Sequence, residues 1–201
     1  MNRRKYLKNW RIFNKHIQKL EGVKSLSRKL VRVAIIMLIG VAFTYLAINL
    51  GKNTTAAEVG EEAPDFTLEG MDGDMISLRD YKGEFVILNF FASWCPPCRE
   101  EAPELQAFEE EFGDQAKLLI LSRAEPKIQV EKFIKEFEST STYVLDFNDS
   151  MAKPYGVLGQ PETFFIDENG IIRYHHVGPM TKKFMVETVN KYKKTPLTGN
   201  R

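Results

Sequence analysis

Residues 85–98 read Phe85-Val-Ile-Leu-Asn-Phe-Phe-Ala-Ser-Trp-Cys95-Pro-Pro-Cys98, an apolar run followed at once by a C-x-x-C motif. Such a run is typical of a strand buried on both faces of a sheet. The residues that follow have a helical pattern, so one sulfur is expected at a helix N-terminus. There the unpaired N–H groups and the positive end of the helix dipole stabilise a thiolate. The sequence therefore predicts thiol–disulfide exchange.

Cys95 and Cys98 are the only cysteines of the chain. A bridge between them closes too small a loop to stabilise the fold much through chain entropy, which favours a cycling pair over an inert local disulfide. Cys95 is expected to attack the substrate, and Cys98, one turn further in, to resolve the mixed disulfide. Pro96 and Pro97 stiffen the turn between them.

Other chemistries find little support in the sequence. Arg99 follows Cys98, so the motif is not a C-x-x-C-H haem attachment site, and no second cysteine pair suggests structural zinc. His175 and His176 are neighbours on a predicted strand and point to opposite faces, as surface or packing residues do. The domain has no Gly-rich phosphate loop and no basic patch. We expect no cofactor, no metal and no nucleic acid partner.

Charge divides the chain sharply. Residues 1–32 hold eleven Lys and Arg and one acid, a net +10, whereas the remaining 17 basic and 26 acidic residues leave −9. Between the two lies Val33 to Leu50, 18 residues without a charge. As a helix this stretch is about 27 Å long, close to a bilayer core of about 30 Å. The positive-inside rule then predicts a cytoplasmic N-terminus and an extracytoplasmic domain at the cell membrane.

The predicted organisation is therefore a basic cytoplasmic tail (1–32), a transmembrane anchor (33–50), a linker (51–57), a catalytic domain (58–194) and a C-terminal tail (195–201). The alternative is a cleaved signal peptide with Thr55-Ala56-Ala57 as its cleavage site. Both the basic lead and the apolar stretch are long for a signal peptide, which favours the anchor.

The domain is predicted to be α/β, with a mixed sheet flanked by helices and an N-terminal β-hairpin. Parallel strands with crossover helices form its core, and a late hairpin at Asn169-Gly170 adds an antiparallel edge. Strands are expected at 63–68, 75–78, 85–91, 117–121, 143–147, 163–167 and 171–177, and helices at about 96–112, 127–138 and 181–194.

At this point the sequence resembles the thioredoxin superfamily, and more closely the membrane-tethered thiol–disulfide oxidoreductases of the ResA/TlpA/CcmG type. The resemblance covers about residues 58–194. It rests on five features: the entry from Gly60 to Leu68, the stretch from Asn89 to Glu101 around the cysteines, Pro103, the segment from Gly159 to Asp167, and the closing hairpin from Gly170 to Gly178.

The resemblance implies roles for further residues. Pro161 is expected to be a cis-proline facing the cysteines, with the neighbouring backbone pairing with a bound substrate chain. Gln160 stands where many relatives have threonine, a departure that alters substrate choice. Trp94 is expected at the rim of the site, with core packing as the alternative. Together with Pro96 and Pro97 these residues form the predicted substrate-binding set.

Glu125 is the predicted third catalytic residue, because ResA-like relatives carry an acid at this place. A buried carboxylate with a raised pKa exchanges protons with a thiol such as Cys98. Two alternatives stay open. Glu125 is an exposed loop carboxylate, or it pairs with Arg123, which lowers its pKa.

The resemblance implies a reductase of disulfides in secreted or membrane-attached proteins. The favoured substrate is apocytochrome c during cytochrome c maturation, and a membrane thiol donor of the CcdA type is the implied electron source. The alternatives are a cell-wall or spore-related client, a disulfide-forming oxidase, and, in a different class, a module that delivers copper or binds clients.

Overall fold

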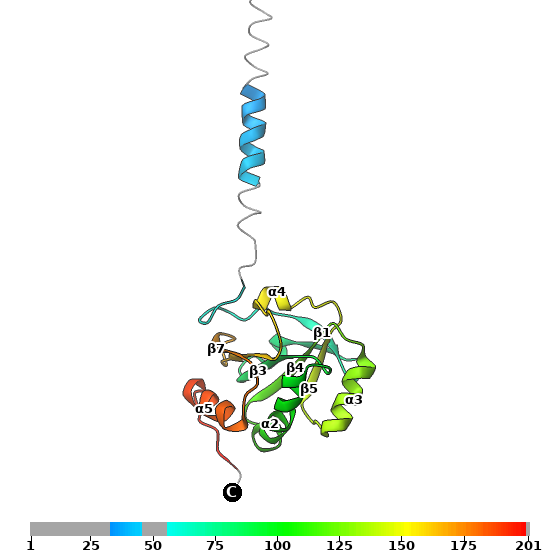
Figure 1. Cartoon of the computed structure of the whole chain (residues 1–201). Helices are drawn as coiled ribbons and strands as arrows, with labels where there is room; N and C mark the ends of the chain where they lie inside the picture. The colour runs from blue at the N-terminus through cyan, green and yellow to red at the C-terminus, as the bar shows by residue number, and fades with distance from the viewer. Residues whose placement is uncertain (1–32, 46–55, 200–201) are drawn as a thin grey trace, which may run out of the picture. The chain divides into compact units, whose positions relative to one another are not determined.

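The computed structural model describes residues 33–45 and 56–199 (Figure 1). Residues 33–45 are helical, with exposed side chains. No helix within the described ranges is long and apolar enough to cross a membrane. The predicted tail, 1–32, and the last part of the predicted anchor, 46–50, lie outside these ranges. The anchor therefore stays a prediction.

Seven strands form one mixed sheet within residues 56–199. They are β1 (Thr67–Gly70), β2 (Met75–Ser77), β3 (Val86–Phe91), β4 (Lys117–Arg123), β5 (Thr142–Asp146), β6 (Glu162–Ile166) and β7 (Ile172–Val177). Their order across the sheet is β2-β1-β5-β4-β3-β6-β7. The central strands β3, β4 and β5 are parallel, and the outer pairs on both sides are antiparallel.

Strand β3 is buried along its whole length because both faces of the sheet are covered. Phe85, Ile87 and Phe91 belong to the core on one face, and alternate residues such as Leu88 and Phe90 belong to the core on the other. Burying one such side chain contributes roughly 1.5–3 kcal/mol. The uninterrupted apolar run therefore fixes β3 at the centre of the domain.

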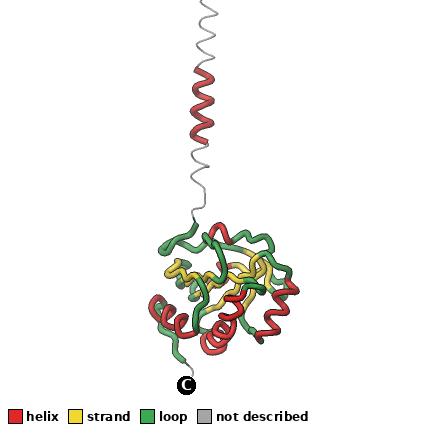
Figure 2. Tube along the Cα trace, in the orientation of Figure 1, coloured by secondary structure: helices red, strands yellow, loops and turns green. Residues whose placement is uncertain are grey.

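The helices are divided unequally between the two faces (Figure 1 and Figure 2). The first core contains residues of α2 (Pro96–Phe112), α3 (Lys127–Phe137) and α5 (Lys182–Tyr192). The second core contains residues of the short α4 (Ala152–Tyr155) and of the segment before β1, namely Ala63 and Phe66. A 3-10 turn, η1 (Leu78–Tyr81), follows β2.

The predicted thioredoxin-like class, with its mixed sheet and N-terminal hairpin, is confirmed. Two details differ. The first strand begins at Thr67 rather than at residue 63, because the entry segment instead forms a single bridge between Glu62 and Ile171. The four-residue helix α4 was not predicted, since one turn is too short to show a helical period.

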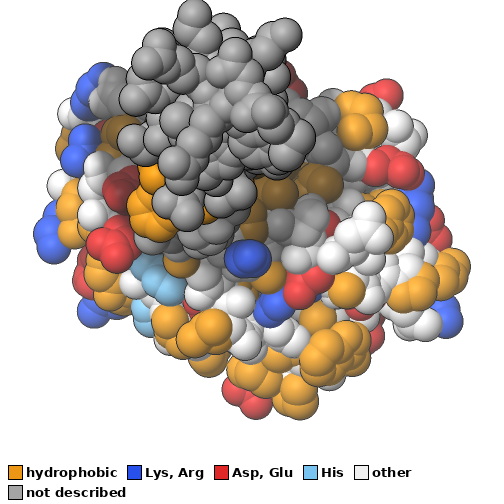
Figure 3. Space-filling view, turned by 90° about the horizontal axis from the view of Figure 1, so that it is seen from above, with side chains coloured by type: hydrophobic (Ala, Val, Ile, Leu, Met, Phe, Trp, Pro, Cys, Tyr) orange, Lys and Arg blue, Asp and Glu red, His pale blue; other side chains and the backbone are white. Residues whose placement is uncertain are grey.

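One end of the sheet gathers the polar residues that matter below. The parallel strands β3, β4 and β5 end there. Strand β6 is antiparallel to β3 and therefore begins there, with Glu162 paired to Phe90. On the face seen in Figure 3, acidic and basic side chains are interspersed, and apolar side chains reach the surface in several separate places. The site lies at the strand ends, where open α/β sheets bind their ligands.

Candidate functional site

The two cysteines occupy the N-terminus of α2, as predicted. Cys95 is the N-cap residue and Cys98 lies in the first turn; both are free thiols and both are buried. Pro96 and Pro97 take the first two helical positions, where a missing N–H costs no hydrogen bond. The strand-to-helix turn therefore places two sulfurs at the positive end of a 17-residue helix.

The loop before β6 faces this helix. The Gln160–Pro161 peptide bond is cis, and the Sγ atom of Cys95 lies 3.4 Å from the carbonyl oxygen of Gln160. The prediction that Pro161 is a cis-proline opposite the cysteines is confirmed. The substrate-binding roles of Gln160 and Pro161 stay predictions.

The thiol of Cys98 is held in its protonated form. Burial raises its pKa well above the ordinary value, and a hydrogen bond to Cys95 and the negative charge of Glu101 act in the same direction. A hydrogen bond from the backbone of Ala92 opposes these effects only in part. Cys98 must therefore lose a proton to a nearby base before it can act as a nucleophile.

Glu101, one helical turn after Cys98, is the residue that the sequence reasoning missed. Its side chain is buried, and burial raises the pKa of its carboxyl to about 7. The backbone N–H of Met180, at 3.1 Å, and the amide of Asn89, at 3.2 Å, donate to its two oxygens and hold the pKa from rising further. A carboxyl with this pKa is suited to exchange protons near neutral pH.

A signal for Glu101 was present in the sequence. It follows Cys98 by three residues and precedes Leu105 by four, so it shares the buried face of the helix with both. A carboxylate on the apolar face of a helix is rarely buried without a function or a partner.

Glu125 is buried, as the prediction requires, so the exposed-loop alternative is wrong. Its carboxylate accepts hydrogen bonds from the backbone N–H and the hydroxyl of Ser93 and from the hydroxyl of Ser122, and no hydrogen bond joins it to either cysteine in residues 56–199. Glu125 therefore braces the turn before Cys95. Its exchange of protons with Cys98 stays a prediction.

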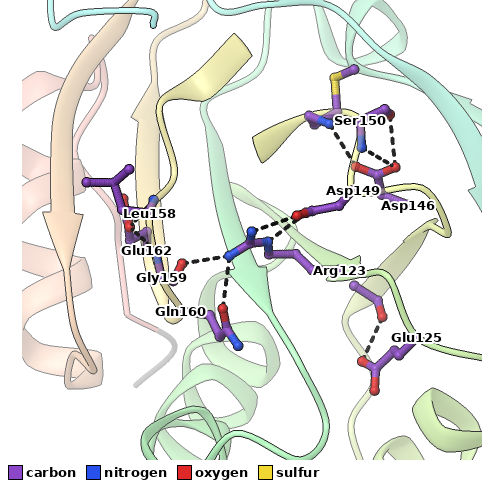
Figure 4. A network of polar contacts seen from close by, with 11 residues as sticks. Arg123, Glu125, Asp146, Asp149, Ser150, Leu158, Gly159, Gln160 and Glu162 are labelled. Carbon is purple, nitrogen blue, oxygen red and sulfur yellow. Dashed lines mark hydrogen bonds and ion pairs between the residues drawn. The ribbon is translucent and has the colours of Figure 1, made fainter. Parts of the chain in front are cut away.

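Arg123 does not pair with Glu125 either. Figure 4 shows the two side chains pointing apart, with Arg123 directed toward Asp149 and Gln160. The alternative in which Arg123 pairs with Glu125 is therefore wrong. The sequence did not reveal this partner, because Asp149 lies 26 residues away on another loop.

Trp94 is 68% exposed beside the buried Cys95. Core packing, the alternative for this residue, is therefore wrong. A large exposed aromatic ring next to a reactive sulfur is available for contact with a partner.

In the ranges 33–45 and 56–199, no group of three His, Cys, Asp or Glu side chains is arranged to hold a metal ion.

Known proteins are similar to this chain over more than half of its length. Residues 59–175 match the AhpC/TSA family. The thiol-disulfide oxidoreductase ResA of Geobacillus thermodenitrificans (strain NG80-2) is 37% identical over 163 residues, which are 80% of this chain and 94% of the relative. The thioredoxin-like protein YneN of Bacillus subtilis (strain 168) is 33% identical over 168 residues, 82% of this chain and 98% of the relative.

The fold also matches solved structures. One is a thiol:disulfide interchange protein of the thioredoxin family from Chlorobium tepidum TLS, with a TM-score of 0.60 and 26% identity. The match covers 68% of this chain and 98% of that structure. Both cysteines lie inside the family match at residues 59–175.

Proposed function

This chain belongs to the AhpC/TSA family and is a thiol-disulfide oxidoreductase of the ResA type, and from that premise we propose that it is an extracytoplasmic reductase of protein disulfides. The observation that carries the proposal is the asymmetry of the two sulfurs. Cys95 faces the substrate-binding loop at Gln160, whereas the thiol of Cys98 is kept protonated inside the protein.

The reaction uses these two environments in turn. The Cys95 thiolate attacks one sulfur of the substrate disulfide; a Cys95–substrate bond forms, and the other substrate sulfur leaves as a thiolate. Glu101 then accepts the proton of Cys98. The Cys98 thiolate attacks Cys95, closing the Cys95–Cys98 disulfide and releasing the second substrate thiol. Two electrons pass from the cysteine pair to the substrate.

The reducing direction follows from the ResA resemblance. A strongly oxidising pair such as that of DsbA owes its potential to a reduced form stabilised by a thiolate at the attacking cysteine. The raised pKa of Cys98 concerns the resolving cysteine and serves the second step of the reaction. The reduction potential of the pair therefore decides between the two directions.

The favoured client is apocytochrome c, whose C-x-x-C-H thiols must be free before haem is attached, and the favoured electron donor is a membrane thiol transporter of the CcdA type. Both follow from the ResA resemblance. The basic residues 1–32 and the uncharged stretch 33–50 support anchoring at the cell membrane with the domain outside the cytoplasm.

The reduction potential of the Cys95–Cys98 pair tests the direction. We expect a value near or below that of thioredoxin, about −270 mV, after equilibration with dithiothreitol. A value near that of DsbA, about −120 mV, would identify an oxidase and overturn the proposed direction.

A cell experiment tests the client. We expect a Cys95→Ser, Cys98→Ser double variant to lose cytochrome c in cells, with recovery when a thiol reductant is added. Normal cytochrome c in that variant would exclude this client.

A further inference from the structure

The carboxyl of Glu101 belongs to a small buried polar cluster that includes two residues of the sheet. Asn89 on β3 and Thr163 on β6 are cross-strand partners in the antiparallel register. Asn89 and Glu101 are each 1% exposed, and Thr163 is fully buried. Because bulk water does not reach these groups, each polar atom depends on partners within the protein. The hydrogen bonds of the cluster therefore decide which protonation state of Glu101 is stable.

A single nitrogen atom makes both hydrogen bonds of the Asn89 side chain. Nδ2 donates to Oε2 of Glu101, at 3.2 Å, and to Oγ1 of Thr163, at 2.9 Å. Oδ1 of the same amide is buried and has no hydrogen-bond partner within residues 56–199. An unpaired buried acceptor is costly, and such groups are rare in folded proteins. The orientation of this amide therefore needs an explanation.

This orientation suits the ionised form of Glu101. Oε1 accepts a hydrogen bond from the backbone N–H of Met180, at 3.1 Å, and Oε2 accepts from Asn89. Both oxygens are then acceptors, as a carboxylate requires. Both bonds lower the pKa of Glu101 against the larger effect of burial. Asn89 in this orientation therefore favours the form of Glu101 that can receive the proton of Cys98.

Protonation of Glu101 reverses what its Oε2 atom needs. In the resolving step the S–H bond of Cys98 breaks and an O–H bond forms on Glu101. The backbone N–H of Met180 can only donate, so Oε1 must stay an acceptor and the proton must lie on Oε2. There the new O–H group meets the NH₂ group of Asn89, and two donors face each other. Half a turn of the amide removes this conflict, because it brings Oδ1 to the place of Nδ2. The hydroxyl of Thr163 can then rotate and donate to the same oxygen.

We propose that Asn89 is a positioning residue whose side-chain amide rotates by half a turn each time Glu101 gains or loses the proton of Cys98. Nδ2 donates to the carboxylate and Oδ1 accepts from the carboxylic acid, with Thr163 as the second partner in both orientations. Both protonation states of a carboxyl sealed from water thus stay hydrogen-bonded. The proposal rests on the proposed function, in which Glu101 is the proton acceptor.

The surroundings of Glu101 contain one titratable partner in this exchange. The thiol of Cys98, on the same helix, interacts electrostatically with Glu101. The groups that face the carboxyl from β3 and from the segment before α5 are an amide and a backbone N–H, neither of which titrates. A pH-dependent change of the Asn89 amide would therefore report the protonation of Glu101.

Infrared difference spectroscopy of the full-length chain in detergent tests the rotation directly. The side-chain carbonyl of asparagine is labelled with ¹³C, and spectra of the reduced protein are compared between pH 5.5 and pH 9. We expect the Asn89 carbonyl band to lie at lower frequency at pH 5.5, because its oxygen then accepts two hydrogen bonds. Asn89→Leu removes this band and so assigns it, and Glu101→Gln should abolish its dependence on pH.

The pH profile of the resolving step tests the effect on Glu101. The rate is that of thiol release from a preformed Cys95 mixed disulfide in a single turnover. Asn89→Leu removes a charge-assisted hydrogen bond from the carboxylate but only a neutral one from the acid, so the ionised form loses more. We expect the midpoint to rise by about one pH unit, which lowers the rate about fivefold at pH 7 and leaves it within about twofold at pH 9.

Another asparagine provides the matched control for these rates. Asn190 accepts a hydrogen bond from the backbone N–H of Leu197 at the C-terminal end of α5, and Asn190→Leu should leave the midpoint in place. Thr163→Val keeps the pair of Asn89 with Glu101 and should reduce the infrared shift without abolishing it. An equal shift in Thr163→Val would exclude Thr163 as the second partner.

Two results would overturn the proposal. They are an Asn89 carbonyl band that does not move between the two pH values, and an unchanged midpoint in Asn89→Leu. If urea unfolding shows that Asn89→Leu does not fold, the wild-type spectra decide alone, with Glu101→Gln as their control. A resolving step that is unchanged in Glu101→Gln would count against the proton acceptor of the proposed function. A slow Glu101→Gln variant with no response of Asn89 would count against this inference alone.

Discussion

The Sγ atom of Cys95 lies 3.4 Å from the carbonyl oxygen of Gln160, a residue 65 positions later in the chain. This contact joins the mouth of α2 to the loop before β6. Cys98, only three residues away from Cys95, has a different environment, in which burial and Glu101 raise the pKa of the thiol. The two sulfurs of one short motif are therefore prepared for two different steps.

The first prediction concerns the reactivity of the thiols. A Cys95→Ser variant leaves Cys98 as its only thiol, and burial, the largest cause of the raised pKa, remains. We expect its alkylation by iodoacetamide at pH 8 to be at least about tenfold slower than that of a free cysteine, whose pKa is about 8.5. Cys98→Ser, which keeps Cys95, is the matched comparison. Equal alkylation of Cys98 and free cysteine would contradict the environment described for Cys98.

The second prediction concerns the proton acceptor. Below pH 7 the carboxyl of Glu101 is protonated and cannot take the proton of Cys98, whereas above pH 7 it is ionised and can. The rate at which Cys98 resolves a mixed disulfide should therefore rise through a pKa of about 7. Glu101→Gln should remove this rise and slow the step at pH 8 by roughly 10²-fold, a usual effect of losing a general base.

The measurement is single-turnover release of a thiol from a preformed Cys95 mixed disulfide between pH 5.5 and 9. Glu100→Gln is the control, because Glu100 is the exposed neighbour of Glu101 on the same helix. A rise near pH 7 that persists in Glu101→Gln would exclude Glu101 as the acceptor. If the rise instead disappears in Glu125→Gln, Glu125 is the proton acceptor of Cys98.

The sequence was sufficient for the fold because its periodic signals are local. The apolar run ending at Phe91, the helix after Cys95 and the Asn169-Gly170 turn each indicate an element without reference to the rest of the chain. Side-chain partners are not local in this way. Arg123 and Asp149 are separated by 26 residues, and only the register of β4 beside β5 brings their loops together.

The partners of Glu101 are also too far away in the sequence to be predicted from it. Its place on the buried face of α2 is readable from spacing. Its pKa is set by burial, which raises it, and by the backbone N–H of Met180, which is 79 residues away and lowers it. The resemblance instead indicates Glu125 as the acidic residue of the site. The structure directs that carboxylate to Ser93 and Ser122.

The third prediction links the pKa of Glu101 to stability. Its pKa is about 7 in the folded protein and 4.5 in the unfolded reference, so the folded state binds the proton more tightly. Stability must then fall as pH rises from about 4.5 to 7 and level off above. Glu101→Gln should remove this loss, gaining roughly 3 kcal/mol relative to wild type between pH 4 and pH 8. Urea unfolding at both pH values measures it, with Glu100→Gln as the control, and a constant difference would contradict the raised pKa.

The last prediction separates binding from folding at Trp94. Because the ring is 68% exposed, Trp94→Ala should change the free energy of unfolding by less than about 0.5 kcal/mol, as is usual for surface substitutions. If the ring contacts the substrate chain, KM for a C-x-x-C-H peptide disulfide should rise several-fold, while the rate with hydroxyethyl disulfide stays the same. Trp94→Phe keeps an aromatic face and should recover most of the loss. Equal KM values in wild type and Trp94→Ala would remove Trp94 from the substrate-binding set, whereas a large loss of stability would show that the ring supports the turn before Cys95.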